Sequence, residues 1–135
     1  QVKNIKLFNY VNYSKIPSLL NKYEVALMPL QKKNFGRGNI DISDSTSPMK
    51  MFDYLASGKI LLASKLSVYN HILMSGYNCF LIDPKNLTRW KDQIYKVFNN
   101  LSKSKKLKVN AKKTAMKYTW QLRVKKIEKK YLNKL

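Results

Sequence analysis

Residues 46–63 read TSPMKMFDYLASGKILLA, and this stretch decides the fold class. Ser47 is a favourable helix cap and Pro48 is tolerated in a first turn, so a helix is expected to open here. The buried stripe predicted for this helix is Met49, Phe52, Leu55 and Ala56. Gly58 is typical of a helix C-terminus. The apolar run 60–63 follows directly and predicts a buried strand, so the stretch reads as one helix–strand unit.

The alternation of helix and strand continues on both sides of this unit. Apolar runs predict further strands at 5–8, 25–30 and 79–82, and the run at 25–30 is expected to be buried on both faces. Helices are predicted at 14–23, 67–74, 86–98, 101–117 and 119–135. This order predicts a doubly wound, Rossmann-like α/β fold with a parallel sheet and three αβα layers. The fold is expected to be incomplete at its N-terminal side and to end in C-terminal helices.

Positive charge is concentrated in the last third of the 135 residues. The chain holds 27 Lys and Arg against 7 Asp and Glu, a formal net charge of +20. Residues 1–84 contain ten bases and five acids, whereas residues 85–135 contain seventeen bases and two acids. Such a tail attracts an anionic membrane surface or nucleic acid, although a compositional bias toward Lys (24 of the 27 bases) is the plainer explanation. No Arg-rich stripe or Cys–His finger accompanies the bases, so no specific nucleic-acid partner is expected.

The composition also limits the chemistry of any site. One cysteine and one histidine exclude a disulfide framework and an ordinary zinc site, and neither a metal nor a cofactor is expected. No apolar run approaches the ~20 residues that span a bilayer. Structural roles, in packing or in turns, are expected for His71, Cys79, Trp120, Tyr131, Gly36 and Gly38.

The ligand site of such a sheet is expected beyond the carboxyl ends of its strands. In this chain that edge is built from residues 9–11, the loop after Leu30 and the helix that opens at Ser47. Unpaired N–H groups and the partial positive charge of a helix N-terminus suit a phosphate or diphosphate. Asp53 is the only acid on this helix, and its carboxylate is suited to accept hydrogen bonds from the hydroxyls of a sugar.

The stretch 46–59, TSPMKMFDYLASGK, closely resembles the donor-site helix of GT-B retaining glycosyltransferases, the glycosyl transferases group 1 family, where one branch often reads TSPLKLFEYLASGKPV. Four further landmarks are similar and follow in the family's order. They are LFNYV at 7–11 with IPSLL at 16–20, VALMPL at 25–30, YNCFLIDP at 77–84, and YTW at 118–120 followed by Arg123. The resemblance therefore covers the whole chain.

The resemblance implies transfer of a hexosyl-type sugar from a UDP- or GDP-sugar donor with retention of configuration and without a bound metal. The family has two glutamates separated by seven residues. Asp53 matches the second, which binds the nucleotide ribose, and has a side chain one methylene shorter. Ser45 stands at the first, near the donor sugar, where an acid is missing, although Asp44 is its neighbour. The backbone of Thr46, Ser47, Pro48 and Met49 would face the diphosphate, Lys50 would assist, and Asn9, Tyr10 and Val11 would line the nucleobase.

The same resemblance predicts two parts in the chain. Residues 1–118 would form a partial nucleotide-sugar-binding domain, and residues 119–135 a helix that packs across to a missing N-terminal acceptor domain. The chain alone is then expected to be inactive, and the intact enzyme to work in the cytoplasm at the inner face of the membrane, in cell-envelope polysaccharide biosynthesis. Two alternatives remain open: a non-catalytic basic Rossmann-like module that binds anionic membrane or nucleic acid, and a degenerate transferase.

Overall fold

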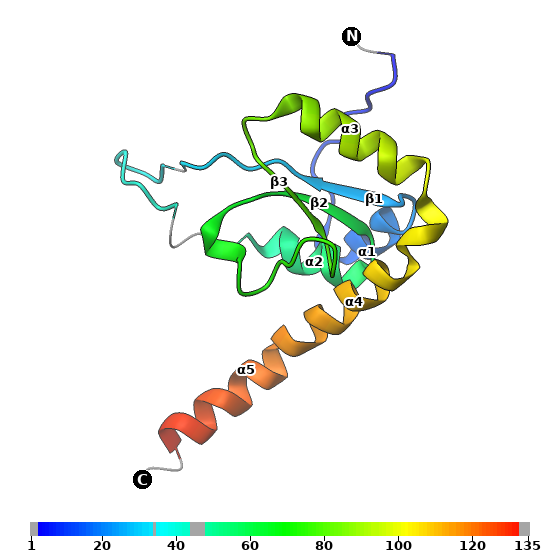
Figure 1. Cartoon of the computed structure of the whole chain (residues 1–135). Helices are drawn as coiled ribbons and strands as arrows, with labels where there is room; N and C mark the ends of the chain where they lie inside the picture. Colours follow the sequence, from blue (N-terminus) through cyan, green and yellow to red (C-terminus); the bar gives the residue numbers. More distant parts are fainter. Residues whose placement is uncertain (1–2, 34, 44–47, 133–135) are drawn as a thin grey trace.

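A parallel three-stranded sheet forms the centre of the molecule (Figure 1). The computed structural model describes residues 3–33, 35–43 and 48–132. The strands are β1 (Val25–Met28), β2 (Ile60–Ser64) and β3 (Phe80–Ile82), hydrogen-bonded in the order β1-β2-β3. In register, Val25 lies beside Ile60 and Leu62 lies beside Phe80. Because the strands are parallel, each connection crosses back over the sheet.

Helices cover both faces of the sheet and complete three layers. α2 (Met49–Ser57) and α4 (Lys105–Ala115) lie on one face, and α3 (Leu87–Phe98) lies on the other (Figure 1). Side chains of β2 alternate between the faces, as successive residues of a strand do. The α2–α4 side buries Met51, Leu55, Leu61, Ala63 and Ala111, and the α3 side buries Ile60, Leu62, Trp90 and Val97. The prediction of a doubly wound α/β fold is confirmed.

The remaining helical elements are short. They are α1 (Ile16–Leu20), α5 (Trp120–Ile127), the 3-10 helices η1 (Tyr13–Lys15), η2 (Ser67–Tyr69), η3 (Leu101–Ser104) and η4 (Met116–Tyr118), and the π-helical η5 (Glu128–Leu132). The side chains of Asn86 and Thr119 cap the helices that follow them. The Asn86 side chain accepts a hydrogen bond from the Arg89 amide at 2.8 Å, and the Thr119 hydroxyl accepts one from the Leu122 amide at 3.3 Å. Local capping chemistry therefore decides where α3 and α5 begin.

Three predicted elements differ from those observed. Residues 5–8 form no strand, because they pair with no neighbouring segment, and Leu7 is 92% exposed. β1 ends at Met28, and its Leu27 is 45% exposed, so the strand is not buried on both faces. The core on the α3 side is centred on β2 and β3 and leaves Leu27 outside. The helix predicted at 67–74 is only the 3-10 helix Ser67–Tyr69 followed by turns.

The buried face of α2 is rotated from the predicted one. Met51 and Leu55 are fully buried, whereas Met49 is 70% exposed and Ala56 is also exposed. Pro48 precedes the helix as its N-cap instead of lying in the first turn, because its ψ of 119° is extended. The predicted cap Ser47 lies outside the described residues. The helix ends as predicted, since Gly58 adopts the left-handed conformation with φ of 66°.

A buried asparagine joins the turn before β3 to helix α4. The Asn78 amide donates to the Ile72 carbonyl at 2.8 Å and to the Thr114 hydroxyl at 3.0 Å. The side-chain carbonyl oxygen of Asn78 accepts a hydrogen bond from the backbone amide of Met74 at 2.9 Å. Asn78 is fully buried, and a buried amide needs such partners. These contacts hold α4 against the sheet and so position the chain that follows it.

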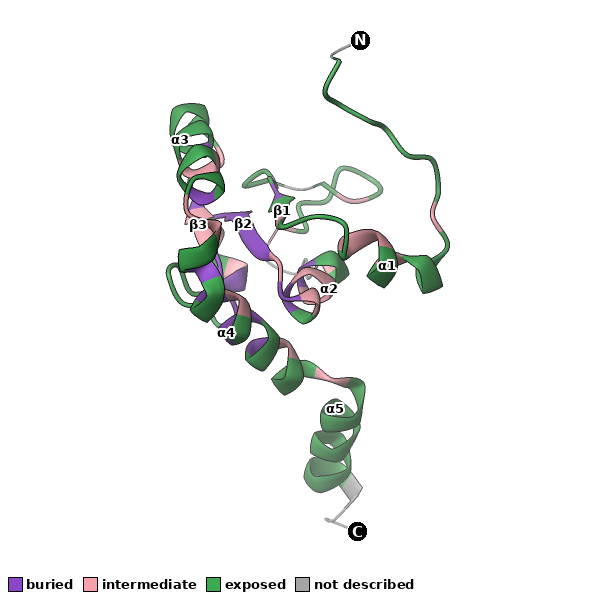
Figure 2. Cartoon of the chain, turned by 90° about the vertical axis from the view of Figure 1, so that its right-hand side faces the viewer, coloured by how far each residue is buried: buried purple, intermediate pink, exposed green. Residues whose placement is uncertain are grey.

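The C-terminal helix differs from the rest of the molecule in its exposure. Figure 2 shows buried residues gathered on β2 and the facing sides of α2 and α4, while α5 is exposed along its whole length. It extends away from the sheet toward the C-terminus (Figure 1). No helix within the described residues has the length and apolar character needed to cross a membrane.

Candidate functional site

The first turn of α2 lies at the edge of the sheet where the strands end. A helix that connects two parallel strands runs antiparallel to them, so α2 begins at the carboxyl edge. The segment 35–43 and η2 lie at the same edge, on the left of Figure 1. An open pocket of about 560 Å³ is lined there by Lys32, Ser43, Lys65, Leu66, Ser67, Val68, Asn70 and Asp83. Lys32 and Ser43 belong to the loop after Leu30 that the sequence placed at this edge, but none of the lining residues is one of the individually predicted donor-site residues.

Asp53 is half-buried in the second turn of α2 and has an aromatic neighbour. The hydroxyl of Tyr13, in η1, donates to Asp53 Oδ1 at 3.5 Å, a long hydrogen bond between residues forty positions apart. No hydrogen bond or ion pair from another described residue reaches the second carboxylate oxygen of Asp53. A carboxylate with this spare accepting capacity is suited to bind hydroxyl groups of a ligand.

Asp53 lines a groove of about 440 Å³ between α2 and the start of α5. The groove is lined by Tyr13, Met49, Phe52, Asp53, Lys117, Tyr118, Thr119, Trp120, Arg123 and Lys126. The rings of Phe52 and Tyr118 pack at 5.6 Å between centroids with an interplanar angle of 47°. The guanidinium carbon of Arg123 lies 5.6 Å from the centre of the Trp120 ring. The groove thus combines aromatic surface, three bases and one acid.

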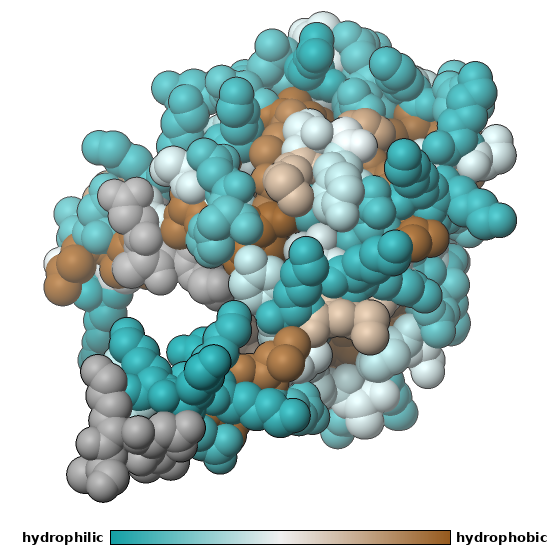
Figure 3. All heavy atoms as spheres, turned by 60° about the horizontal axis from the view of Figure 1, so that its bottom comes forward, coloured by the Kyte–Doolittle hydropathy of each residue, from teal (hydrophilic) through white to brown (hydrophobic). Residues whose placement is uncertain are grey.

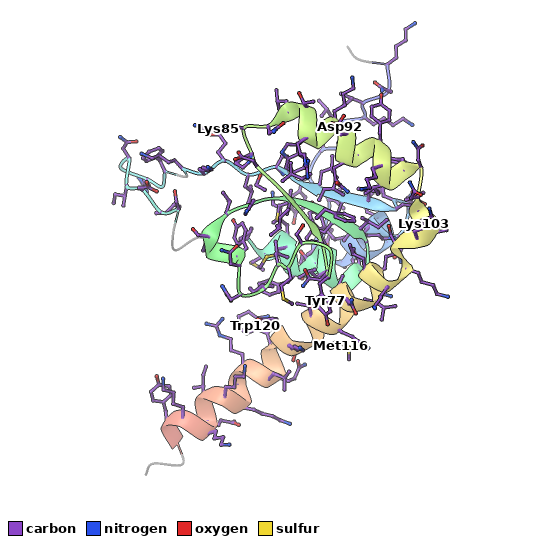
Figure 4. The ribbon with its side chains drawn as sticks, in the orientation of Figure 1. Tyr77, Lys85, Asp92, Lys103, Met116 and Trp120 are labelled. Atoms are coloured by element: carbon purple, nitrogen blue, oxygen red, sulfur yellow. The ribbon has the colours of Figure 1, made fainter. Side chains whose placement is uncertain are left out.

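The basic tail borders this groove, because Lys117, Arg123 and Lys126 line it. Figure 3 shows mainly hydrophilic side chains on the part of the chain that leads to the C-terminus. In Figure 4, Trp120 lies where the chain passes from α4 into α5, and Asp92 lies on α3, across the sheet from it. Nucleotide-binding sites elsewhere use this combination of aromatic faces and cations for the base and the phosphates.

The structure brings some predicted site residues together and not others. Met49 and Asp53 line the groove, and Pro48 is half-buried just before α2. Lys50 is exposed on α2 and is not part of the groove lining. Asp44, Ser45, Thr46 and Ser47 lie outside the described residues.

The predicted nucleobase segment is separate from α2. Asn9 and Tyr10 are exposed and Val11 is half-buried. In the part of the chain that the structure describes, no hydrogen bond joins these three residues to α2, whereas the nearby Tyr13 reaches Asp53. The structure therefore shows a hydrogen bond from Tyr13 to Asp53, the residue predicted to bind the ribose.

Sequence reasoning missed the contribution of the C-terminal segment. Trp120 was expected to have a packing role, and in the described structure it is 72% exposed and lines the groove. Tyr131, assigned to packing in the same way, is 60% exposed. The sequence signal for this part of the groove was the YTW motif at 118–120 with Arg123, which resembles a family landmark without revealing where it lies.

Other candidate groups are not placed for chemistry. His71 is exposed in the turn after η2, and its carbonyl accepts from the Tyr118 hydroxyl at 3.4 Å. Burial raises the pKa of the Cys79 thiol to about 12, which leaves it protonated and poorly nucleophilic at neutral pH. Gly38, with φ of 79°, lies in a turn beside the bridge between Phe35 and Asp41, as turn chemistry predicted. Within the described ranges, no three His, Cys, Asp or Glu side chains form a cluster able to hold a metal ion.

Comparisons with known proteins agree with this fold. An uncharacterized glycosyltransferase of Methanocaldococcus jannaschii is 23% identical over 130 residues, which are 96% of this chain and 34% of that protein. The chain thus spans about a third of that relative's length. The sucrose-phosphate synthase of Thermosynechococcus elongatus is similar in structure, with a TM-score of 0.61 and 13% identity over 83% of this chain and 26% of that one. The family model of the glycosyl transferases group 1 matches residues 2–114. The chain therefore belongs to the glycosyl transferases group 1 family.

Proposed function

We propose that this chain is the donor-binding part of a retaining glycosyltransferase that uses a UDP- or GDP-sugar and no metal ion. The observation that carries the proposal is the position of α2. Its first turn lies at the carboxyl edge of the sheet, and Asp53, one turn further on, lines the groove that Met49 also lines. Family membership favours the same donor class.

The binding chemistry follows from two parts of α2, its N-terminus and Asp53. The amides at the N-terminus of α2 point toward the carboxyl edge and carry a partial positive charge, which attracts a diphosphate. Asp53 then accepts hydrogen bonds from the vicinal hydroxyls of the ribose, and these replace its long hydrogen bond from Tyr13.

The transfer step requires stabilisation of a leaving group. The bond between the anomeric carbon and the diphosphate oxygen breaks, the acceptor oxygen forms the new bond on the same face, and the acceptor proton is released. Negative charge builds on the departing nucleoside diphosphate, and oriented N–H groups with nearby cations stabilise it. In this proposal the first turn of α2 supplies the N–H groups, and Lys50 adds a cation from the exposed side of the helix.

The acceptor side of the reaction is proposed to come from a second domain. The relative from Methanocaldococcus jannaschii is about three times as long as its matched segment, which leaves room for such a domain there. On α5 and η5, Val124, Ile127 and Tyr131 are 49%, 49% and 60% exposed. Their spacing of three and four residues places them on one side of a helix. We propose that this apolar side packs on the acceptor domain.

A nucleotide titration tests the donor site directly. Isothermal titration of the chain with UDP and with GDP is expected to show saturable binding of one of them. Asp53→Asn, which keeps the size of the side chain and removes its charge, is expected to weaken that binding by about 1–3 kcal/mol. Asp92→Asn is the matched control, since Asp92 is an exposed acid on α3, across the sheet (Figure 4). If a folded chain binds neither nucleotide, the donor-site proposal is wrong.

The charge of the chain supports one competing function, a basic module for an anionic membrane. Residues 85–135 hold seventeen bases and two acids, and α5 is exposed throughout. Such a module would bind vesicles that contain phosphatidylglycerol, and lose them at high salt, with no dependence on Asp53. A cytoplasmic enzyme at the inner face of the membrane would show both vesicle and nucleotide binding. A degenerate transferase would bind nucleotide, and its full-length protein would transfer no sugar.

A further inference from the structure

We infer that the start of α5 forms a second wall of the donor site, in which Arg123 and Lys126 bind the diphosphate of the donor. This inference rests on the proposed function and deepens it. The predicted donor contacts all lie in residues 9–53, whereas these two cations come from a segment about seventy residues further along the chain.

The geometry of the groove places these cations opposite the predicted donor helix. One wall is Met49, Phe52 and Asp53 of α2, and the facing wall runs from Lys117 to Lys126. Met49 is the first residue of α2, so the groove reaches the helix end that attracts a diphosphate. A ligand that contacts Asp53 and the first turn of α2 therefore also lies within the space that Arg123 and Lys126 line.

The facing wall is held in place at its base. Tyr118 packs on Phe52 of α2 and donates to the His71 carbonyl, so both sides of the groove are tied together at this point. Thr119 then caps α5 and sets the direction of the helix. Trp120, Arg123 and Lys126 follow at intervals of three residues, which places them along one side of α5. Trp120 lies four residues before Val124, and Arg123 lies four residues before Ile127, so this side overlaps the apolar stripe of Val124 and Ile127.

The charge of the groove favours an anionic ligand. Asp53 is its single acid among the lining residues, against the cations of Lys117, Arg123 and Lys126. In the described part of the chain, no carboxylate forms an ion pair with any of these cations. The planar guanidinium of Arg123 is suited to bidentate phosphate binding, and the ring of Trp120 at 5.6 Å orients it.

The test separates the phosphate contact from the rest of the site. The chain is titrated with the preferred nucleoside diphosphate and with the matching nucleoside, which lacks the phosphates. Arg123→Gln and Lys126→Gln are each expected to weaken nucleoside diphosphate binding about tenfold, the usual effect of losing one charged hydrogen-bond partner. Neither change should alter nucleoside binding by more than about twofold. Lys125→Gln is the matched control, because Lys125 is exposed on the same helix and does not line the groove.

Each other result overturns the inference. If Asp53→Asn weakens binding and both α5 variants bind the diphosphate normally, the donor site stands and α5 takes no part in it. If the α5 variants lose nucleoside and nucleoside diphosphate binding to the same extent, the cations do not act on the phosphates. If the unaltered chain binds neither ligand, the proposed function and this inference are both wrong. Folding is not at issue, since α5 contributes no buried residue, and circular dichroism of each variant verifies it.

Discussion

Replacing Asn78 with alanine is expected to lower the free energy of unfolding by about 3–5 kcal/mol. Asn78 is fully buried, and its side chain makes three hydrogen bonds, to Ile72, Met74 and Thr114. The Thr114 hydroxyl keeps a second hydrogen bond, which it donates to the Asn110 carbonyl at 2.9 Å, so the loss of its bond to Asn78 costs about 1 kcal/mol. The Ile72 carbonyl and the Met74 amide lose a partner inside the protein, at roughly 1–2 kcal/mol each.

Urea unfolding followed by far-UV circular dichroism and tryptophan fluorescence measures this change. Trp90 is 8% exposed and reports on the core, whereas the exposed Trp120 contributes little to the spectral shift. Asn99→Ala is the matched control, since this exposed asparagine has no side-chain hydrogen bond in the described structure, and it should change stability by less than about 0.5 kcal/mol. A loss below about 1 kcal/mol for Asn78→Ala would refute the assignment of Asn78 as the contact that holds α4 to the sheet.

Four further outcomes are expected. With the pKa of Cys79 raised to about 12 by burial, its thiolate fraction at pH 8 is about a thousandfold below that of an ordinary thiol, so a thiol reagent should label the folded chain slowly and the unfolded chain fast. Because burial raises the pKa of the folded Cys79 thiol above that of the unfolded one, the unfolding free energy should fall as the pH rises from about 9 to about 12, and Cys79→Ala should remove this contribution. Gly58→Ala should lower the free energy of unfolding by about 1–2 kcal/mol, because φ is 66° and the new methyl would overlap the Lys112 side chain, which has to move. An unchanged melting temperature would contradict the assigned C-cap. Asn86→Ala should lower the free energy of unfolding by about 1 kcal/mol, because the side chain that caps α3 through the Arg89 amide is removed. Asn86→Asp should retain most of this stability, because it keeps the accepting oxygen.

Features decided by local chemistry could be predicted from the sequence. Asn86 and Thr119 each carry a side-chain oxygen directly before a helix, and both cap it, as residues of these types commonly do. The continuous apolar run of β2 predicts a strand buried on both faces, and all five of its residues are buried. These decisions depend on neighbours within a few positions, which the sequence displays directly.

Features decided by distant neighbours could not be predicted in the same way. Residues 5–8 have a strand-like pattern, but a strand requires a partner, and the pattern does not name one. Met49 and Met51 are chemically identical, so only the docking of α2 on the sheet decides which of them is buried. The candidate site shows the same limit. Asp53 was found from its motif, whereas Tyr13 and Arg123 join it across forty and seventy positions of chain.

The connection between α4 and α5 would couple the groove to any partner that binds the outer part of α5. α4 is fixed to the sheet through Thr114, whereas α5 follows Thr119, whose extended backbone interrupts the helix, and α5 has no buried residue. The eight residues of α5 span about 12 Å, so a 10° rotation about this hinge moves its far end by about 2 Å while Trp120 hardly shifts. Lys126 would move with the far end and change the width of the groove. A partner that fixes the outer part of α5 would therefore alter donor affinity, and donor binding would alter affinity for that partner by the same factor.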